Sequence, residues 1–378
     1  MLMDNVEVVR KGDSNGNGML IRVQLPSGIE ILGLPTENAY GGGWDLGPTW
    51  NYLVLDDTPF LVDTGRLNMG QKLLDMIPYT GISASDIAFV MVSHGHEDHD
   101  GSLYDIATSI RAPVRGHLVY DRLIRYYPDV ARTPMQKKFP ALCWRCFMPE
   151  SYSEKNCREY QETRSRLTIE TIKNDPEPLS TNTVAHHVPG HSPDALAILV
   201  GDEALLVGDT VLPGITPWPS QEAFYHPVKP ILSPEYPTAD SVFGLRAYLR
   251  SLKKLKELGD RRGNLMVLPG HRLYYNNVWN DLNLTTRIDE LIEHHIQRCG
   301  AILEILKHGP KTIRDLSLLH FDAPLLKGFG ILMAENEMIS HCELLEACGD
   351  LQSPTGGEYK ATGHINFESA IRSLTSIR

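Results

Sequence analysis

Short apolar runs that end in glycine or in a polar side chain recur along the first three-quarters of the chain. Tyr52–Leu55 and Pro59–Val62 flank the polar triplet 56–58 and predict a hairpin. Apolar residues at helical spacing within 67–77 predict a helix. Further helices are expected over 102–110 and 241–258. Other strands are expected over residues 19–25, 28–32, 87–92, 112–115, 167–172, 183–188, 195–200, 204–207 and 265–268. This mixture predicts an α/β fold with two sets of strands packed between helices.

Three segments depart from this pattern. Residues 1–18 are polar and glycine-rich, and we expect a frayed lead-in. Residues 118–165 are rich in Arg, Tyr and Pro, and we interpret them as a mostly helical insertion over the edge of a site, since long loops in compact domains are often functional. Residues 212–240 contain seven prolines and predict a loop at the mouth of that site.

The character of the chain changes after about residue 284. Arg287–His308, Thr312–Leu319 and Phe329–Cys348 have helical patterns, and residues 356–362 predict a terminal β-wing. Three helices and a wing indicate a small winged-helix-like α+β module. We therefore expect two domains, residues 1–284 and residues 285–378.

The chemistry of the chain is concentrated in residues 93–101, Ser-His-Gly-His-Glu-Asp-His-Asp-Gly. In an extended segment His94, His96 and Asp98 share one face, because alternate residues point the same way. Imidazole and carboxylate groups suit divalent zinc or iron. The alternative, a solvated loop that is merely histidine-rich, is disfavoured because later apolar runs also end in glycine followed by a ligand-type side chain. Those side chains are His191, Asp209 and His271. Asp63 is another carboxylate at a strand end, although no glycine precedes it.

Composition sets limits on partners and location. The chain has 378 residues, 42% of them hydrophobic, and a net charge of −11. An acidic balance argues against a nucleic-acid partner, which usually requires a basic face. No run of 18 apolar residues and no signal peptide is visible, so we expect a cytoplasmic protein that does not enter a membrane.

The six cysteines do not suggest a disulfide scaffold in a chain of this length. Cys143, Cys146 and Cys157 have metal-like spacing. Two interpretations stay open for these three residues: a structural zinc or iron–sulfur cluster, or simple buried thiols.

The motif His94-Gly-His96-Glu-Asp98-His99 resembles the signature of the metallo-β-lactamase superfamily. The later His191, Asp209 and His271 are similar to its remaining ligands, and Asp63-Thr64-Gly65 resembles its upstream Asp motif. The resemblance covers roughly residues 19–284 and is nearest to the hydroxyacylglutathione hydrolase (glyoxalase II) and β-lactamase-like protein 2 branches. It implies a four-layer αββα sandwich. The insertion at 118–165 departs from both branches.

The resemblance also implies a pair of divalent metal ions, zinc first, although the same ligands accept iron or manganese. His94, His96 and His191 would hold one ion, and Asp98, His99 and His271 the other, with Asp209 bridging. Such ions lie roughly 3.5–4 Å apart and hold a hydroxide that acts as the nucleophile. Asp98 and Asp209 would thus serve catalysis as ligands. We expect Asp63 to hold a ligand imidazole in its tautomer.

Two enzymatic functions follow from the resemblance. The first is hydrolysis of a small-molecule acyl thioester, and the alternative is a metal-dependent endoribonuclease or other phosphodiesterase. The basic helix predicted over 241–258 would suit phosphates, but Glu335, Glu337, Glu343 and Glu346 on a C-terminal helix would repel them. A third interpretation makes the C-terminal module a dimerisation or regulatory unit on an inactive hydrolase. The intact ligand set argues against it, although a homodimer stays open.

Overall fold

The structure is a computed structural model. It describes residues 5–38, 45–126, 159–232, 234–263, 265–328, 330–353 and 357–376. It also describes the backbone of two short strands that pair with each other, β8 (Leu142–Cys143) and β9 (Met148–Pro149).

The larger of two central sheets comes mainly from the first third of the chain. Its strands are β1 (Val6–Arg10), β2 (Leu20–Gln24), β3 (Glu30–Thr36), β4 (Thr49–Leu55), β5 (Phe60–Val62), β6 (Phe89–Met91), β7 (Val114–His117) and β10 (Ile169–Ile172). They lie side by side in that order. The strands from β1 to β5 pair antiparallel, and those from β5 to β10 pair parallel. The carboxyl ends of β5 and β6 therefore lie at the same edge.

The second sheet has the order β11 (Glu177–Pro178), β12 (Thr183–His187), β13 (Leu196–Val200), β14 (Ala204–Gly208) and β15 (Met266–Pro269). The strands β11 to β14 pair antiparallel, whereas β14 and β15 are parallel. The connection between β14 and β15 contains η4 (Glu222–Phe224), α7 (Tyr225–Leu232), η5 (Ala239–Ser241) and α8 (Gly244–Arg262). A short hairpin, β16 (Tyr274–Tyr275) and β17 (Val278–Trp279), follows β15.

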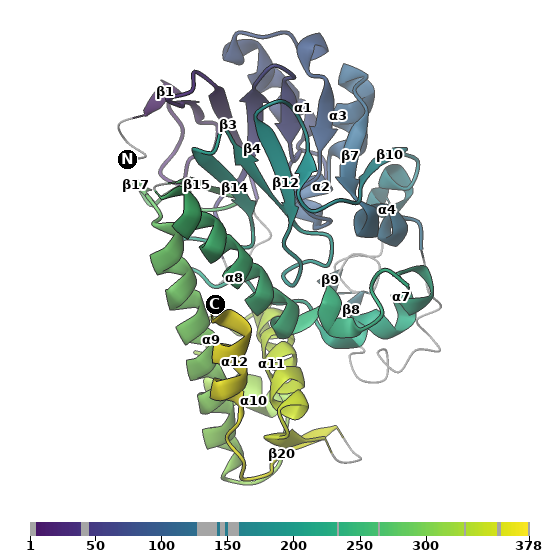
Figure 1. Ribbon diagram of the computed structural model, residues 1–378, viewed down its shortest axis with the longest axis vertical. Coiled ribbons are helices and arrows are strands. Elements are labelled where there is room, and N and C mark those ends of the chain that lie inside the picture. Colours follow the sequence, from purple (N-terminus) through teal and green to yellow (C-terminus); the bar gives the residue numbers. More distant parts are fainter. Residues whose placement is uncertain are drawn as a thin grey trace.

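The central strands of each sheet, such as β4, β6 and β13, are buried on both faces, which explains why they are nearly continuous apolar runs, whereas the edge strand β1 is mostly exposed. In β5, Phe60 and Val62 pack into the core between the sheets, and Leu61 packs into the outer core. That outer core also holds side chains from α1 (Gly70–Met76) and α3 (Leu103–Ile110). In β13 the even-numbered residues face the first sheet, whereas Ala197 and Leu199 face α8. The predicted α–β–β–α layering is confirmed (Figure 1).

Shorter elements connect these layers. They are η1 (Ile77–Thr80), η2 (Ala84–Asp86), α2 (Glu97–Asp100) and α4 (Leu118–Ile124).

The C-terminal region extends from the outer face of the second sheet. It consists of α9 (Leu284–Leu306), α10 (Ile313–His320), α11 (Gly330–Ala347) and α12 (Phe367–Thr375), with the strand order β18 (Lys311–Thr312), β20 (Glu358–Ala361) and β19 (Leu351–Gln352). Figure 1 shows α9 running beside α8 and on to the other C-terminal helices. One apolar core includes Leu249 of α8, Ile288 of α9 and Cys342 of α11. The domain boundary at 284/285 and the winged-helix topology stay predictions.

Several sequence-based predictions were wrong in detail. Residues 6–10 form strand β1, because pairing with β2 satisfies their backbone despite their polar surroundings. Part of the proline-rich segment 212–240 is helical in α7, where Pro227 lies in the first turn and needs no amide bond there. Helix α12 was not predicted. The insertion is helical in α4 and at 159–164, while most of it lies outside the described residues.

Candidate metal centre

The candidate ligands lie at strand ends from both sheets. His94 and His96 follow β6, and Asp98 and His99 lie in α2 directly after them. The second sheet supplies His191 beyond β12, Asp209 after β14 and His271 after β15. Most are buried, with His99 and His271 fully so. The structure thus brings together all seven predicted ligand side chains.

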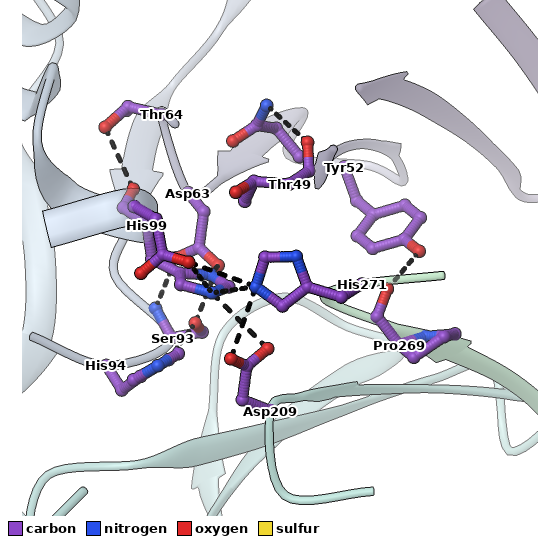
Figure 2. A network of polar contacts seen from close by, with 12 residues as sticks. Thr49, Tyr52, Asp63, Thr64, Ser93, His94, His99, Asp209, Pro269 and His271 are labelled. Carbon is purple, nitrogen blue, oxygen red and sulfur yellow. Dashed lines mark hydrogen bonds and ion pairs between the residues drawn. The ribbon is translucent and has the colours of Figure 1, made fainter. Parts of the chain in front are cut away.

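These side chains form two adjoining groups. His94, His96 and His191 form the first, and Asp98, His99, Asp209 and His271 form the second, each with ligand atoms within 4.8 Å of one another. Asp209 lies between the groups, since its Oδ2 is 3.3 Å from His271 Nε2 and 3.7 Å from His191 Nε2. Figure 2 shows His99, Asp209 and His271 converging on one point.

Four ligand histidines are held by a protein group at Nδ1, which leaves Nε2 for the cluster: His94, His99, His191 and His271. His191 Nδ1 lies 2.9 Å from the Trp218 carbonyl oxygen, and His271 Nδ1 lies 3.1 Å from that of Pro48. The Nε2 atoms of His94 and His191 are buried and have no hydrogen-bond partner among the described residues. A buried polar atom without a partner is costly. Because a metal-binding histidine is typically held in this way, the donor set fits divalent metal ions.

Asp63 connects the two ligand groups through contacts to the Nδ1 sides of their histidines. One of its oxygens accepts from the Ser93 amide at 2.8 Å, and the other accepts from Ser93 Oγ at 2.6 Å and lies 2.8 Å from His99 Nδ1. Ser93 Oγ in turn lies 3.0 Å from His94 Nδ1. The carboxylate therefore orients His99 directly and His94 through the serine (Figure 2). Asp63 has a φ of 63°, which turns the chain sharply after β5.

Sequence analysis missed two contributors besides Ser93. Asn38 Nδ2 donates to Asp98 Oδ2 at 2.9 Å, and the backbone of Trp218 holds His191. Gly270 precedes His271, and a Cβ there would lie 2.4 Å from Asp209 Oδ1. The glycine before a strand-end ligand was a usable signal for close approach. Asn38 carried no signal, because it lies 60 residues before its partner.

The two groups differ in charge. Burial lowers the pKa of His96 to about 3 and also lowers the pKa values of His94 and His191, so these imidazoles are neutral. Burial alone would lower the pKa of His271, but the Asp209 and Asp98 carboxylates raise it to about 9. The same kind of pairing raises the pKa of His99 and lowers that of Asp209. The carboxylates of the second group thus favour positive charge beside them, which a bound cation would also supply.

A pocket of about 430 Å³ opens onto the cluster at His191 and Asp209. Leu212, Ile215 and Trp218 from the proline-rich segment line it, as expected for the mouth of a site. Arg272 also lines it, with its guanidinium over the Tyr275 ring at 4.5 Å.

Other histidines lie apart from the cluster. His117 stacks on His187 with ring centroids 3.7 Å apart, and neither belongs to the two ligand groups. His294 reaches the pocket, whereas His295 is buried against His341. The predicted cluster of Cys143, Cys146 and Cys157 concerns side chains outside the described residues.

The fold and the ligand clusters define a metal-binding protein of hydrolase type. The sequence profile of the metallo-β-lactamase superfamily matches residues 44–271, more than half of the chain. The chain belongs to the metallo-β-lactamase superfamily, whose members are generally metal-dependent hydrolases. It is 23% identical over 268 residues to a β-lactamase-like protein 2 homologue of Caenorhabditis elegans, covering 70% of this chain and 68% of that protein.

Two solved structures share most of the fold. A metallo-β-lactamase family protein of Thermus thermophilus has a TM-score of 0.64 and 22% identity, covering 88% of this chain and 98% of that one. A β-lactamase domain protein of Burkholderia ambifaria has a TM-score of 0.62 and 18% identity, covering 93% and 95%. Among the described residues, no helix is both long and apolar enough to cross a bilayer.

Proposed function

We propose that this protein is a dinuclear metal-dependent hydrolase whose substrate is an acyl thioester. The observation that carries the proposal is the pair of adjoining ligand groups with Asp209 between them. His94, His96 and His191 would hold one ion. Asp98, His99 and His271 would hold the other, and Asp209 would contact both. Zinc suits this nitrogen and oxygen donor set best, although iron and manganese are also compatible.

When bound, the ions supply an ionised water as nucleophile and a Lewis acid for the carbonyl oxygen. The protein's own groups keep the donors in place for that chemistry. Asp63 and Ser93 fix the ring orientations of His99 and His94, and Asn38 holds one oxygen of Asp98. Among the described residues neither ligand group contains a cysteine, and the hydroxyl of the neighbouring Ser93 donates to Asp63, which supports water rather than a side chain as nucleophile.

The charge arrangement on α8 supports a thioester rather than RNA as substrate. The five cations that made the predicted helix 241–258 basic are paired with carboxylates within the protein, so they are poorly available to a phosphate backbone. The pairs are Arg246 with Glu222 at 2.7 Å, Arg250 with Asp240 at 2.7 Å, Lys253 with Glu257 at 3.8 Å, Lys254 with Asp175 at 2.5 Å and Lys256 with Asp289 at 2.5 Å. The similarity to a β-lactamase-like protein 2 homologue keeps an endoribonuclease as the second candidate.

The test begins by stripping the protein with a chelator and reloading it with zinc, iron or manganese. We expect two ions per chain, and hydrolysis of acyl-coenzyme A or acyl-glutathione without cleavage of single-stranded RNA. Asp209→Ala removes the shared ligand, so it should lose metal and activity together. The matched control is Asp289→Ala, which removes an exposed carboxylate on α9 and should lose neither.

Three results would contradict the proposal in different ways. Fewer than two ions per chain after reloading would refute a dinuclear site. A fully loaded protein that cleaves RNA and leaves thioesters intact would favour the second candidate. A loaded protein inert toward both substrates would remove both functions.

A further inference from the structure

The pocket beside the metal centre is lined by residues of the two-sheet part of the protein and by residues of the C-terminal region. At one end it meets His191 and Asp209, and its walls include Leu46, Leu212 and Ile215. The remaining lining comes from the C-terminal region and includes Phe321, Leu325 and Met333. Its volume of about 430 Å³ is within the range of small-molecule sites. The C-terminal region therefore forms a wall of the space that a substrate would occupy.

The two buried charged groups at the C-terminal wall, Arg298 and Glu337, neutralise one another. Arg298 pairs with Glu337 at 2.6 Å, and both side chains are nearly buried. The Arg298 guanidinium also lies over the Phe321 ring, 4.8 Å from its centroid. Burial lowers the pKa of His320, so that imidazole is neutral near pH 7. An anionic group entering here would have to compete with the Glu337 carboxylate for Arg298.

The one other arginine of the described pocket lining is similarly engaged. Arg272 stacks on Tyr275 and donates from Nη2 to the Asp45 carbonyl oxygen. The Tyr275 hydroxyl in turn donates to the Asp45 carboxylate at 2.7 Å. Away from the metal centre, the pocket thus offers apolar side chains, two arginines that already have partners and the Asp322 carboxylate, which would repel an anion.

We propose that this pocket binds an uncharged apolar acyl chain, with the scissile carbonyl at the metal centre and the chain directed toward Phe321, Leu325 and Met333. The proposal rests on the thioesterase function proposed above and specifies its substrate class as thioesters of linear, uncharged acyl groups. The C-terminal region then determines how long a chain the enzyme accepts. Hydrolysis breaks the carbon–sulfur bond, and water supplies the hydroxyl of the released acid and the proton of the thiol.

The first test is a series of linear acyl thioesters with the metal-loaded enzyme. Burying a methylene is worth about 0.8 kcal/mol, so kcat/KM should rise about fourfold per methylene until the pocket is full. A hexanoyl thioester should exceed the adipoyl thioester of equal length by more than about tenfold, because the terminal carboxylate would be buried without a free cation. A flat series, or a preference for adipoyl, would overturn the proposal.

The second test changes the C-terminal wall. Leu325→Trp and Met333→Trp should shorten the longest accepted chain by two or more methylenes, which lowers kcat/KM for that chain by about fifteenfold. For the acetyl thioester, kcat/KM should fall by much less than for the longest chain. Two variants are used because either one alone could disturb folding. The matched control is Leu319→Trp, an exposed position outside the described pocket lining that should leave the series unchanged. Equal effects of all three variants would refute the assignment.

A binding measurement separates this proposal from the proposed function. Straight-chain alkan-1-ols are titrated into the metal-loaded protein, and tryptophan fluorescence is recorded with Trp218→Phe as the reference. Affinity that rises with chain length while no thioester is hydrolysed would support the apolar pocket and refute the thioesterase. Thioester hydrolysis without chain-length-dependent binding would do the reverse.

Discussion

Asp63→Asn tests how the structure positions its metal ligands. Asparagine has nearly the same size as aspartate and tolerates the left-handed backbone of this position, where φ is 63°. However, it replaces one accepting oxygen by an NH2 donor. Asp63 accepts two hydrogen bonds from Ser93 and contacts His99 Nδ1, so at least one of these donors would face another donor.

The magnitude follows from the tautomer of His99. If the amide NH2 faces Nδ1, the ring proton must move to Nε2, which is the nitrogen facing Asp209 at 3.3 Å. A protonated Nε2 cannot bind metal. Loss of such an outer partner typically lowers metal affinity about 10–100-fold, or about 1.4–2.7 kcal/mol. We expect this loss at the second group, with a smaller effect at the first, which Asp63 reaches only through Ser93.

Competition with a chromophoric chelator measures the affinity for each ion. The matched control is Asp202→Asn, because Asp202 has a φ of 54° and a largely exposed side chain that pairs only with Arg262 among the described residues. The control should leave both metal affinities unchanged. If Asp63→Asn also left both unchanged, the orienting role of Asp63 would be refuted.

Three further changes have defined outcomes. Gly270→Ala should reduce bound metal below two ions per chain, as measured by atomic emission, because the new Cβ would lie 2.4 Å from Asp209 Oδ1. Arg164→Met should cost about 3–5 kcal/mol of unfolding free energy in urea, because it removes the buried cation 3.0 Å from Asp100. Burial raises the pKa of Asp194 from 3.8 to about 6, so the folded state binds this proton more tightly than the unfolded chain. Stability should therefore fall by up to about 3 kcal/mol between about pH 4 and pH 6, and Asp194→Asn should remove that part of the slope.

Each of these predictions has a control in the same chain. Gly300 lies within α9, and a Cβ there would come no closer than 3.9 Å to Phe367 of α12. Gly300→Ala should therefore leave the metal content intact. Arg262→Met removes the cation of an exposed pair and should cost no more than about 1 kcal/mol. Asp202→Asn is the control for the pH dependence of stability. Metal retention in Gly270→Ala, a loss in Arg164→Met no larger than its control, or an unchanged pH slope in Asp194→Asn would each contradict the corresponding reasoning.

The strands and most of the candidate site were predictable because their signals are local. The hydrophobic run 204–207 forms strand β14, which ends at Gly208, one residue beyond the predicted end. The short spacing from His94 to His99 already implied that their side chains converge. The layering was predictable from the resemblance. What failed was non-local: β1 depends on pairing with β2, and Asn38 depends on a partner 60 residues away.

The interpretation of the basic helix 241–258 failed for the same reason, because it depended on contacts between residues far apart in the sequence. Its cations suggested a phosphate surface, yet their partners Asp175 and Asp289 lie far away in the sequence and become neighbours only in the fold. The pocket wall was equally hidden, because Phe321 and Met333 show no sequence pattern that relates them to Asp209. Sequence could identify the donors of the centre, but not the shape of the space beside it.

The origin of the ligands has a consequence for how the protein acquires metal. Each ligand group takes side chains from both sheets. In the first group, His94 and His96 come from the first sheet and His191 from the second. In the second group, Asp98 and His99 come from the first sheet, and Asp209 and His271 from the second. A nascent chain that has formed only the first sheet therefore offers at most two donors to either ion. Tight metal binding would therefore require that the two halves have docked, and bound metal would then oppose their separation.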